Sequence, residues 1–127
     1  LQIIKERWEK DIPKPLRKIP ILVGGGGEKV TLKITAKYAD MWHGFGDPEQ
    51  IAHKMEVLNN WCSEVGRNPG EIECCCGTGG ADSDKTREAY VQAGASHLIL
   101  GMSERPGEPF NFNLVKHLVR WRDQHNG

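Results

Sequence analysis

The sequence predicts an α/β protein in which four strand–helix units form a parallel sheet. Three observations predict this class. Short apolar runs alternate with amphipathic segments of helical period, glycines or capping residues stand between them, and the alternation occurs four times. A strand can continue into a parallel neighbour only after a crossover, and each amphipathic segment is long enough to be that crossover.

The composition is that of a globular protein with balanced charge. Of 127 residues, 38% are hydrophobic and 27% charged, a mixture that can bury a core. Because 17 basic and 17 acidic side chains cancel, we expect no nucleic acid partner. No apolar run approaches the roughly 20 residues that cross a bilayer, and the start of the chain does not resemble a signal peptide. We therefore expect no membrane association and a cytoplasmic location.

The chain divides into a leader and a body. Residues 1–18 form a leader segment with a short helix, which a pair of prolines should stop at Asp11 or Ile12. Residues 19–127 carry the four strand–helix units. The first unit has a β-branched strand over residues 19–24 and a helix over residues 28–39.

The second unit carries the clearest local signal. A short strand over residues 39–43 precedes Asp47, a suitable N-cap, with Pro48 at the first helical position and Gln50 three residues after the cap. This arrangement predicts a capping box. Gly66 stands where the helix should end in a left-handed conformation.

The last two units follow the same pattern. The third has a strand over residues 71–77 and a helix over about 85–93 that ends at Gly94. The candidate caps of this helix are Asp82, Ser83 and Asp84. The fourth has a strand over residues 96–102 and a final helix with Leu114, Leu118 and Trp121 on one face.

Three of the four cysteines are adjacent and lie in the third predicted strand. Neighbouring side chains of a strand point to opposite faces, so Cys74, Cys75 and Cys76 cannot easily converge on one metal ion. Cys62 stands apart from them. We therefore predict buried cysteines that act as small hydrophobic residues, and no metal site.

Two architectures fit four parallel units. One is a small open sheet, and the other is half of an eightfold (β/α)8 TIM-type barrel, whose usual length of about 250 residues is near twice this chain. Half a barrel has two bare edges and an apolar inner face. We expect a second copy of the chain to complete it, as a homodimer.

A cluster of four glycines separates the first strand from the first helix of the body. Gly24, Gly25, Gly26 and Gly27 allow close approach of a ligand, and the following helix offers free amides and a positive dipole to an anion. Their spacing matches neither common phosphate motif. The glycines could therefore form either a phosphate-binding site or a simple tight turn. The charge of Glu28 would repel a phosphate.

Several segments together resemble one family. PILVGGGGEKVTLKITAKYADMW, DPEQIAHKMEVLNNWCSEVGRNPGEIE and AGASHLILGM, within about residues 19–121, are similar in order and spacing to segments of luciferase-like monooxygenases. The resemblance is strongest to the branch that uses a deazaflavin coenzyme. It implies the carboxyl-terminal half of an eightfold barrel that binds FMN or a deazaflavin of the F-420 type at the carboxyl ends of its strands.

The resemblance also implies roles for residues of this chain. Gly24, Gly25 and Gly26, with Gly27 beside them, would lie where backbone amides meet the coenzyme phosphate or side chain. Trp42 and His43 would face the cofactor mouth. Met41 departs from the family pattern, in which glycine is common at this position. The first four strands of the family, with much of its ring pocket, have no counterpart in these residues.

Other side chains are weaker candidates for chemistry. His43 is the best acid or base, because it ends a strand and imidazole exchanges protons near neutral pH. Lys29 and Arg105 could bind phosphate. Asp40 is better explained as the partner of a backbone amide or a lysine. We interpret the remaining residues as structural or solvated: Trp61 and Trp121 in packing, His97 within a strand, and His53, His117 and His125 on helices.

Three hypotheses follow for function. The first is one half of a flavin- or deazaflavin-dependent oxidoreductase or monooxygenase, with the glycines at the coenzyme phosphate. The second is a non-catalytic half-barrel dimer that binds a phosphate-bearing small molecule. The third is a structural fragment without activity.

Overall fold

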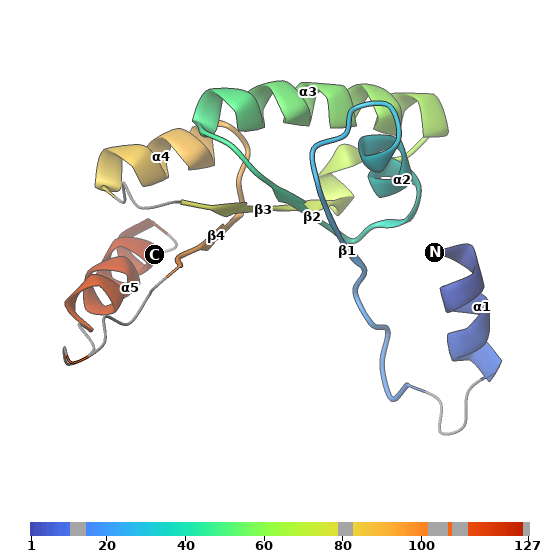
Figure 1. The fold of residues 1–127 in the computed structure, drawn as a ribbon, viewed down its shortest axis with the longest axis horizontal. Helices are drawn as coiled ribbons and strands as arrows, with labels where there is room; N and C mark the ends of the chain where they lie inside the picture. The colour runs from blue at the N-terminus through green and yellow to red at the C-terminus, as the bar shows by residue number, and fades with distance from the viewer. Residues whose placement is uncertain (11–14, 79–82, 102–106, 108–111, 126–127) are drawn as a thin grey trace.

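A computed structural model of the chain describes residues 1–10, 15–78, 83–101, 107 and 112–125. Its strands are β1 (Leu22–Gly24), β2 (Met41–Gly44), β3 (Glu73–Gly77) and β4 (His97–Ile99). Its helices are α1 (Gln2–Lys10), α2 (Thr31–Tyr38), α3 (Pro48–Val65), α4 (Asp84–Gln92) and α5 (Asn113–His125), with a short 3-10 helix at Pro69–Glu71. The predicted alternation of strands and helices is confirmed (Figure 1).

The four strands form one parallel sheet in the order β1-β2-β3-β4. Strands that neighbour one another in sequence are therefore neighbours in space. This is the strand order of a (β/α)8 barrel, whereas a doubly wound sheet reverses its order at a switch point. The predicted α/β class is confirmed, while completion of the sheet by a second copy stays a prediction.

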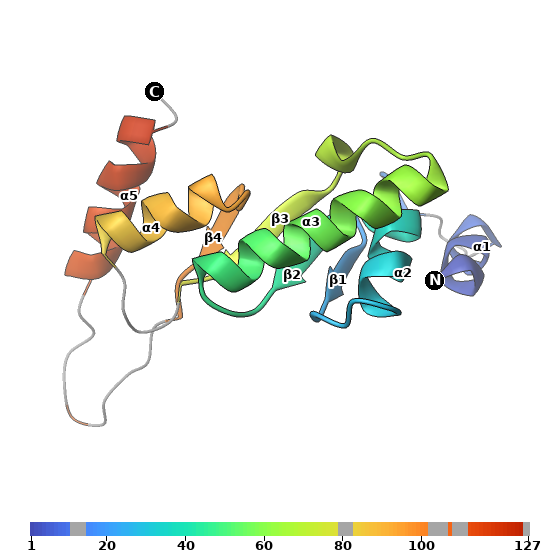
Figure 2. The ribbon, with the colours of Figure 1, turned by 90° about the horizontal axis from the view of Figure 1, so that it is seen from above.

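Helices α2, α3 and α4 cover one face of the sheet, as Figures 1 and 2 show from two directions. Their apolar side chains pack on the strand residues that point to that face. The core cluster comprises Leu32, Ala36, Trp42, Ile51, Leu58, Cys62, Ile72, Cys74, Cys76, Tyr90 and Ala95. Burial of these side chains removes apolar surface from water and holds the helices on the sheet.

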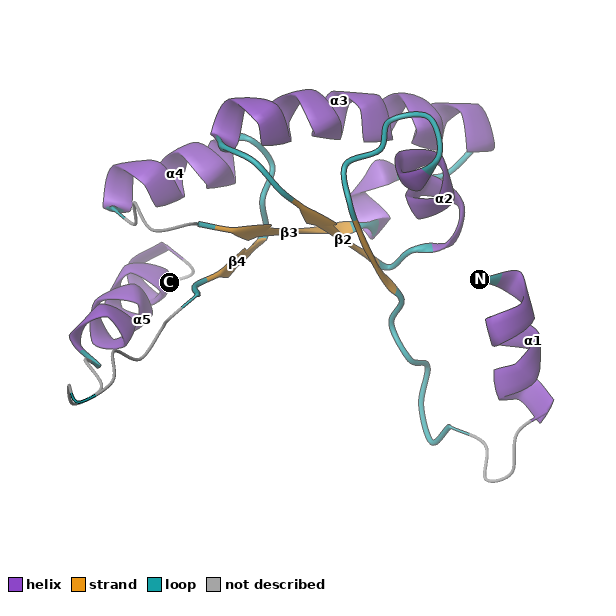
Figure 3. Cartoon of the chain, in the orientation of Figure 1, coloured by secondary structure: helices purple, strands orange, loops and turns teal. Residues whose placement is uncertain are grey.

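The opposite side of the sheet, which we call the uncovered face, carries the alternate strand residues. Its members, from strand register, are Leu22, Gly24, Met41, His43, Glu73, Cys75, Gly77, His97 and Ile99. Leu22 is 50% exposed and Ile99 is 41% exposed. In Figure 3 the strands lie beneath the arch of α2, α3 and α4, with α1 and α5 at its two ends.

The strands predicted at 39–43, 71–77 and 96–102 are observed at Met41–Gly44, Glu73–Gly77 and His97–Ile99, and two further boundaries shift for identifiable reasons. β1 begins only at Leu22, because the N–H of Ile21 donates to the Asp40 carboxylate at 2.9 Å. α2 begins at Thr31, since residues 28–30 form a turn and Leu32 N–H donates back to Gly27 O at 3.0 Å. The predicted stop at Asp11 or Ile12 lies outside the described residues, as do two other predicted boundary positions, Asp82 and Met102.

Helix α3 begins and ends as predicted. The Asp47 carboxylate accepts from Gln50 N–H at 2.9 Å, and the Gln50 side chain accepts from Asp47 N–H at 3.0 Å, which completes the capping box. Gly66 closes the helix in a left-handed conformation with φ of 68°. The cap therefore defines where α3 starts relative to the carboxyl edge of the sheet.

The cysteines are buried and unpaired by disulfides, as predicted. Cys74 and Cys76 point to the helix-covered face and belong to the core cluster, whereas Cys75 belongs to the uncovered face and is nevertheless only 1% exposed. Burial raises the pKa of the Cys75 and Cys62 thiols. These thiols therefore act as small apolar side chains.

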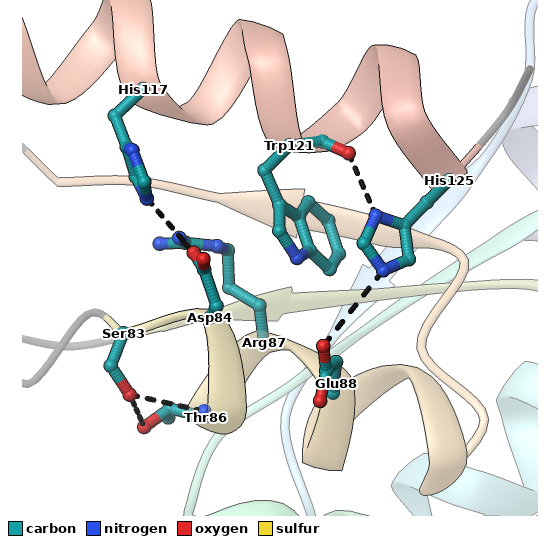
Figure 4. A network of polar contacts seen from close by, with 8 residues as sticks. All are labelled: Ser83, Asp84, Thr86, Arg87, Glu88, His117, Trp121 and His125. Atoms are coloured by element: carbon teal, nitrogen blue, oxygen red, sulfur yellow. Dashed lines mark hydrogen bonds and ion pairs between the residues drawn. The ribbon is translucent and has the colours of Figure 1, made fainter.

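Helix α5 rests on α4 through polar and ring contacts rather than a buried apolar face (Figure 4). His117 Nε2 lies 2.9 Å from Asp84 Oδ1, and the Arg87 guanidinium lies 5.3 Å from the Trp121 ring. His117 and then Arg87 hold the pKa of Asp84 below its ordinary value. α5 has no buried residue, and the same is true of α1.

None of the helices in the described ranges combines the length and apolar character that a bilayer crossing requires.

Candidate functional site

The candidate site is the connection between β1 and α2, residues 24–30, which we call the glycine loop. It leaves the carboxyl end of β1 beside β2, and Gly25 N–H donates to the His43 carbonyl at 3.2 Å. This position is the carboxyl edge of a parallel sheet, where α/β proteins commonly bind ligands.

The backbone of the glycine loop requires glycine at one position and has little room at another. Gly25 has φ of 120°, a conformation that side chains of L residues rarely adopt. A Cβ on Gly27 would lie 2.8 Å from Thr31 Oγ1. By contrast, a Cβ on Gly24 would meet nothing within 4 Å, so its glycine is not required by packing.

Two tryptophans hold the carbonyls of the glycine loop. Trp42 Nε1 donates to Gly25 O at 2.8 Å, and Trp61 Nε1, from α3, donates to Glu28 O at 2.7 Å. Trp42 is fully buried in the core. The loop is therefore anchored near both of its ends, and its amides are presented from a defined backbone.

Five successive amides of the glycine loop have no hydrogen-bond partner among the described residues. None of the hydrogen bonds there has the N–H of residues 26–30 as donor. α2 begins at Thr31, at the end of this loop, so the positive end of its helix dipole adds favourable potential for an anion near the last of these amides. Free amides beside a helix amino terminus form a favourable place for an anion.

His43 lies next to the glycine loop on the uncovered face. Strand register places Gly24, His43, Cys75 and His97 in one row across the sheet. The His43 ring is partly exposed and contacts the Phe45 ring edge-on, with centroids 4.6 Å apart. An imidazole at this position can exchange protons with a ligand bound over the uncovered face.

Trp42 and His43 point to opposite faces of the sheet, because successive strand residues alternate. Trp42 lies under the glycine loop, so its contact with a ligand would be indirect, through Gly25. Met41 shares the face of His43 but lies one row closer to the amino end of the strand. The Met41 side chain is therefore farther from the carboxyl edge of the sheet, where the glycine loop lies, than the side chain of His43.

The remaining predicted candidates have clear positions. Asp40 accepts hydrogen bonds from Lys18 Nζ at 2.5 Å and Ile21 N–H at 2.9 Å, as predicted. Burial opposes its ionisation, but these two bonds hold the pKa of Asp40 below its ordinary value. Lys29 is exposed on the glycine loop, and Arg105 lies outside the described residues. His97 lies 3.2 Å from the Glu73 carboxylate.

Sequence reasoning did not find two residues that the structure brings to the glycine loop. Lys54 Nζ and His53 Nε2, both on α3, lie 2.5 Å and 3.1 Å from Glu28 Oε1. They are 25 or more positions from Glu28 in sequence, and nothing in their local pattern distinguishes them from solvated helix residues. The available signal was Trp61, because an indole N–H on the inner side of a helix usually finds a hydrogen-bond acceptor on a neighbouring segment.

In the part of the chain that the structure describes, no three His, Cys, Asp or Glu side chains are grouped so that they could hold a metal ion.

The parallel strands in sequential order, with helices on one face and a glycine loop at the carboxyl edge, define an α/β protein whose arrangement is similar to that of (β/α)8 barrels. The family model of the luciferase-like monooxygenases matches residues 7–126. The chain belongs to this family.

A solved structure has a similar fold: an F420-dependent secondary alcohol dehydrogenase in complex with an F420-acetone adduct. The TM-score is 0.58 at 14% sequence identity, over 69% of this chain and 44% of the other. The likeness at this identity concerns the fold. The chain thus spans less than half the length of that protein. No curated protein matches the chain.

Proposed function

We propose that this chain forms one half of the coenzyme site of a flavin- or deazaflavin-dependent oxidoreductase. In this proposal the glycine loop binds the coenzyme phosphate. The single observation that carries it is the run of amides over residues 26–30, at the carboxyl edge of the sheet, that donate no hydrogen bond to any described residue. Family membership and the deazaflavin named for the similar structure support it.

The residues present fit a phosphate ester. Gly24 and Gly26 have no side chain over the loop, so a phosphate can approach the backbone. The amides of Gly26 and Gly27 would donate to its oxygens, and the amino end of α2 would favour its charge. Trp42 would hold the Gly25 carbonyl, and with it the peptide plane of the Gly26 amide, while Trp61 would hold the loop at Glu28.

His43 is our candidate for proton transfer near the bound coenzyme. When bound, a flavin or deazaflavin ring supplies hydride transfer, and the protein contributes position and protons. His43 stands on the uncovered face next to the glycine loop, which is where a ring attached to a loop-bound phosphate could lie. We favour a deazaflavin over FMN, because the similar structure is described with F420.

The proposal is tested by following backbone amides of the isotope-labelled chain during titration with FMN, with a deazaflavin coenzyme and with riboflavin. FMN and the deazaflavin coenzyme carry a phosphate, and riboflavin does not. The expected result is that the Gly26 and Gly27 signals move with the two phosphorylated compounds and stay in place with riboflavin. NMR detects binding with millimolar dissociation constants, so the measurement is possible even if this chain supplies only half of the coenzyme site.

Unchanged Gly26 and Gly27 signals with every compound would overturn the proposal. Equal movement with riboflavin and FMN would also count against it, because the phosphate would then contribute nothing at the loop.

A second candidate is a non-catalytic dimer that binds a phosphate-bearing molecule. The half-exposed Leu22 and Ile99 on the uncovered face favour it, since such side chains gain by being covered. In this candidate two copies form a barrel-like pair, and the glycine loop binds phosphate without redox turnover. Phosphate binding by a dimer that does not respond to the flavin or deazaflavin ring would support it over the first.

A further inference from the structure

Helix α3 brings a cation to the glycine loop. Lys54 Nζ donates to Glu28 Oε1 at 2.5 Å, and His53 Nε2 lies 3.1 Å from the same oxygen. The Lys54 side chain is 24% exposed and that of Glu28 is 43% exposed, so Lys54 has the more enclosed side chain of the two. Partial enclosure strengthens an ionic contact relative to one in open solvent.

The end of the Lys54 side chain lies against the loop backbone. A Cβ placed on Gly26 would be 3.6 Å from Lys54 Cε, which is ordinary van der Waals contact. The ammonium is one bond beyond that carbon. It therefore lies close to the backbone of Gly26 as well as to the Glu28 carboxylate.

Glu28 is an anion at the place where a ligand anion should bind. The hydrogen bond from Lys54, followed by that from His53, holds the pKa of Glu28 below its ordinary value, so its carboxylate is charged at neutral pH. A phosphate at the loop amides and the Glu28 carboxylate would both be attracted to the Lys54 ammonium. The phosphate and the Glu28 carboxylate would therefore compete for the ammonium of Lys54.

We propose that Lys54 is a phosphate-binding residue of the glycine loop and that Glu28 is its competitor within the chain. The carboxylate holds the ammonium while no ligand is bound, and a phosphate dianion then takes its place. This inference rests on the proposed function, because it names the cation of the same site. It explains why an acidic residue can follow the glycines of a phosphate-binding loop.

The directions in which two substitutions change phosphate affinity distinguish this proposal from a purely structural role for the ion pair. Lys54→Met and Glu28→Gln both break the same ion pair. If the pair only ties the loop to α3, both changes should loosen the loop and weaken phosphate binding alike. If Glu28 competes with phosphate, Lys54→Met weakens binding whereas Glu28→Gln strengthens it.

The experiment measures the dissociation constant of inorganic phosphate from the Gly26 and Gly27 amide signals. We expect a rise of about tenfold for Lys54→Met, the size of one lost charge-assisted hydrogen bond. We expect a severalfold fall for Glu28→Gln, and the double variant should resemble Lys54→Met. A surface ion pair contributes little to stability, so all variants should fold. Their melting temperatures check this.

The matched control is Lys37→Met, which removes an equal charge from the exposed last turn of α2. It should leave the dissociation constant nearly unchanged. If wild type binds phosphate but both site variants weaken it, or neither changes it, Lys54 and Glu28 lack these roles while the proposed function stands. If the wild-type loop signals respond to no phosphate compound, the proposed function fails and this assignment fails with it.

Discussion

Two indole N–H groups define the geometry of the glycine loop at the scale of single residues. Trp42 bonds to the Gly25 carbonyl from within the core, and Trp61 bonds to the Glu28 carbonyl from α3. A carbonyl that is held in this way cannot rotate toward the ligand side. The N–H of Gly26 shares a peptide plane with the Gly25 carbonyl and points the opposite way, so the bond from Trp42 keeps this amide directed away from the Trp42 ring.

Replacing Trp42 with Phe should loosen the glycine loop. The change removes the bond to Gly25 O and some buried volume, so we expect roughly 2 kcal/mol of destabilisation. Urea unfolding followed by circular dichroism measures it, and phosphate affinity should fall in parallel.

Trp121→Phe is the control for this change. Among the described residues, Trp121 Nε1 is buried and has no hydrogen-bond partner, so this variant loses no such bond. We expect less than about 1 kcal/mol of destabilisation and unaltered phosphate affinity. Equal losses in the two variants would show that the bond to Gly25 contributes little.

At the scale of elements, α3 is the helix that joins the core to the candidate site. Its inner face gives Ile51, Leu58 and Cys62 to the core cluster. Another side gives His53, Lys54 and Trp61 to the glycine loop. Because the same helix carries both sets of residues, we expect a change at its amino terminus to alter the position of the glycine loop.

Asp47→Ala should destabilise the chain by about 1 kcal/mol, since it removes the N-cap of α3 and leaves Gln50 N–H unsatisfied. Thermal unfolding measures this loss. We expect Asp47→Asn to retain most of the stability, because an amide oxygen can also cap. Equal melting temperatures for Asp47→Ala and wild type would contradict the importance of the capping box.

At the scale of the whole molecule, the sheet is covered by helices on one face only. Its outer strands β1 and β4 each pair on one side within the described residues, and apolar side chains on the uncovered face remain half exposed. Open parallel edges and half-exposed apolar side chains favour association. A partner that supplies further strands would cover both.

Light scattering after size-exclusion chromatography should give twice the 14.2 kDa mass of the chain. Leu22→Lys, on the uncovered face, should shift the population toward monomer, because a charge would be buried in the contact. Val30→Lys is the control, since Val30 is 65% exposed and lies outside the strands. A wild-type monomer at every accessible concentration would contradict the dimer.

The sequence by itself determined the order and kind of the elements. The signals for these elements are local. Hydrophobic periods of two and 3.6 residues predict the strands and helices, the Asp47 cap and Gly66 mark the ends of one helix, and the glycine loop falls between a strand and a helix. Only the tertiary structure decided which side chains meet there. Lys54, His53 and Trp61 reach Glu28 because of the way α3 crosses the sheet. The helices on one face bury Trp42, whereas His43, on the other face, stays partly exposed. Contacts between residues 25 to 33 positions apart depend on packing angles, which no local pattern encodes.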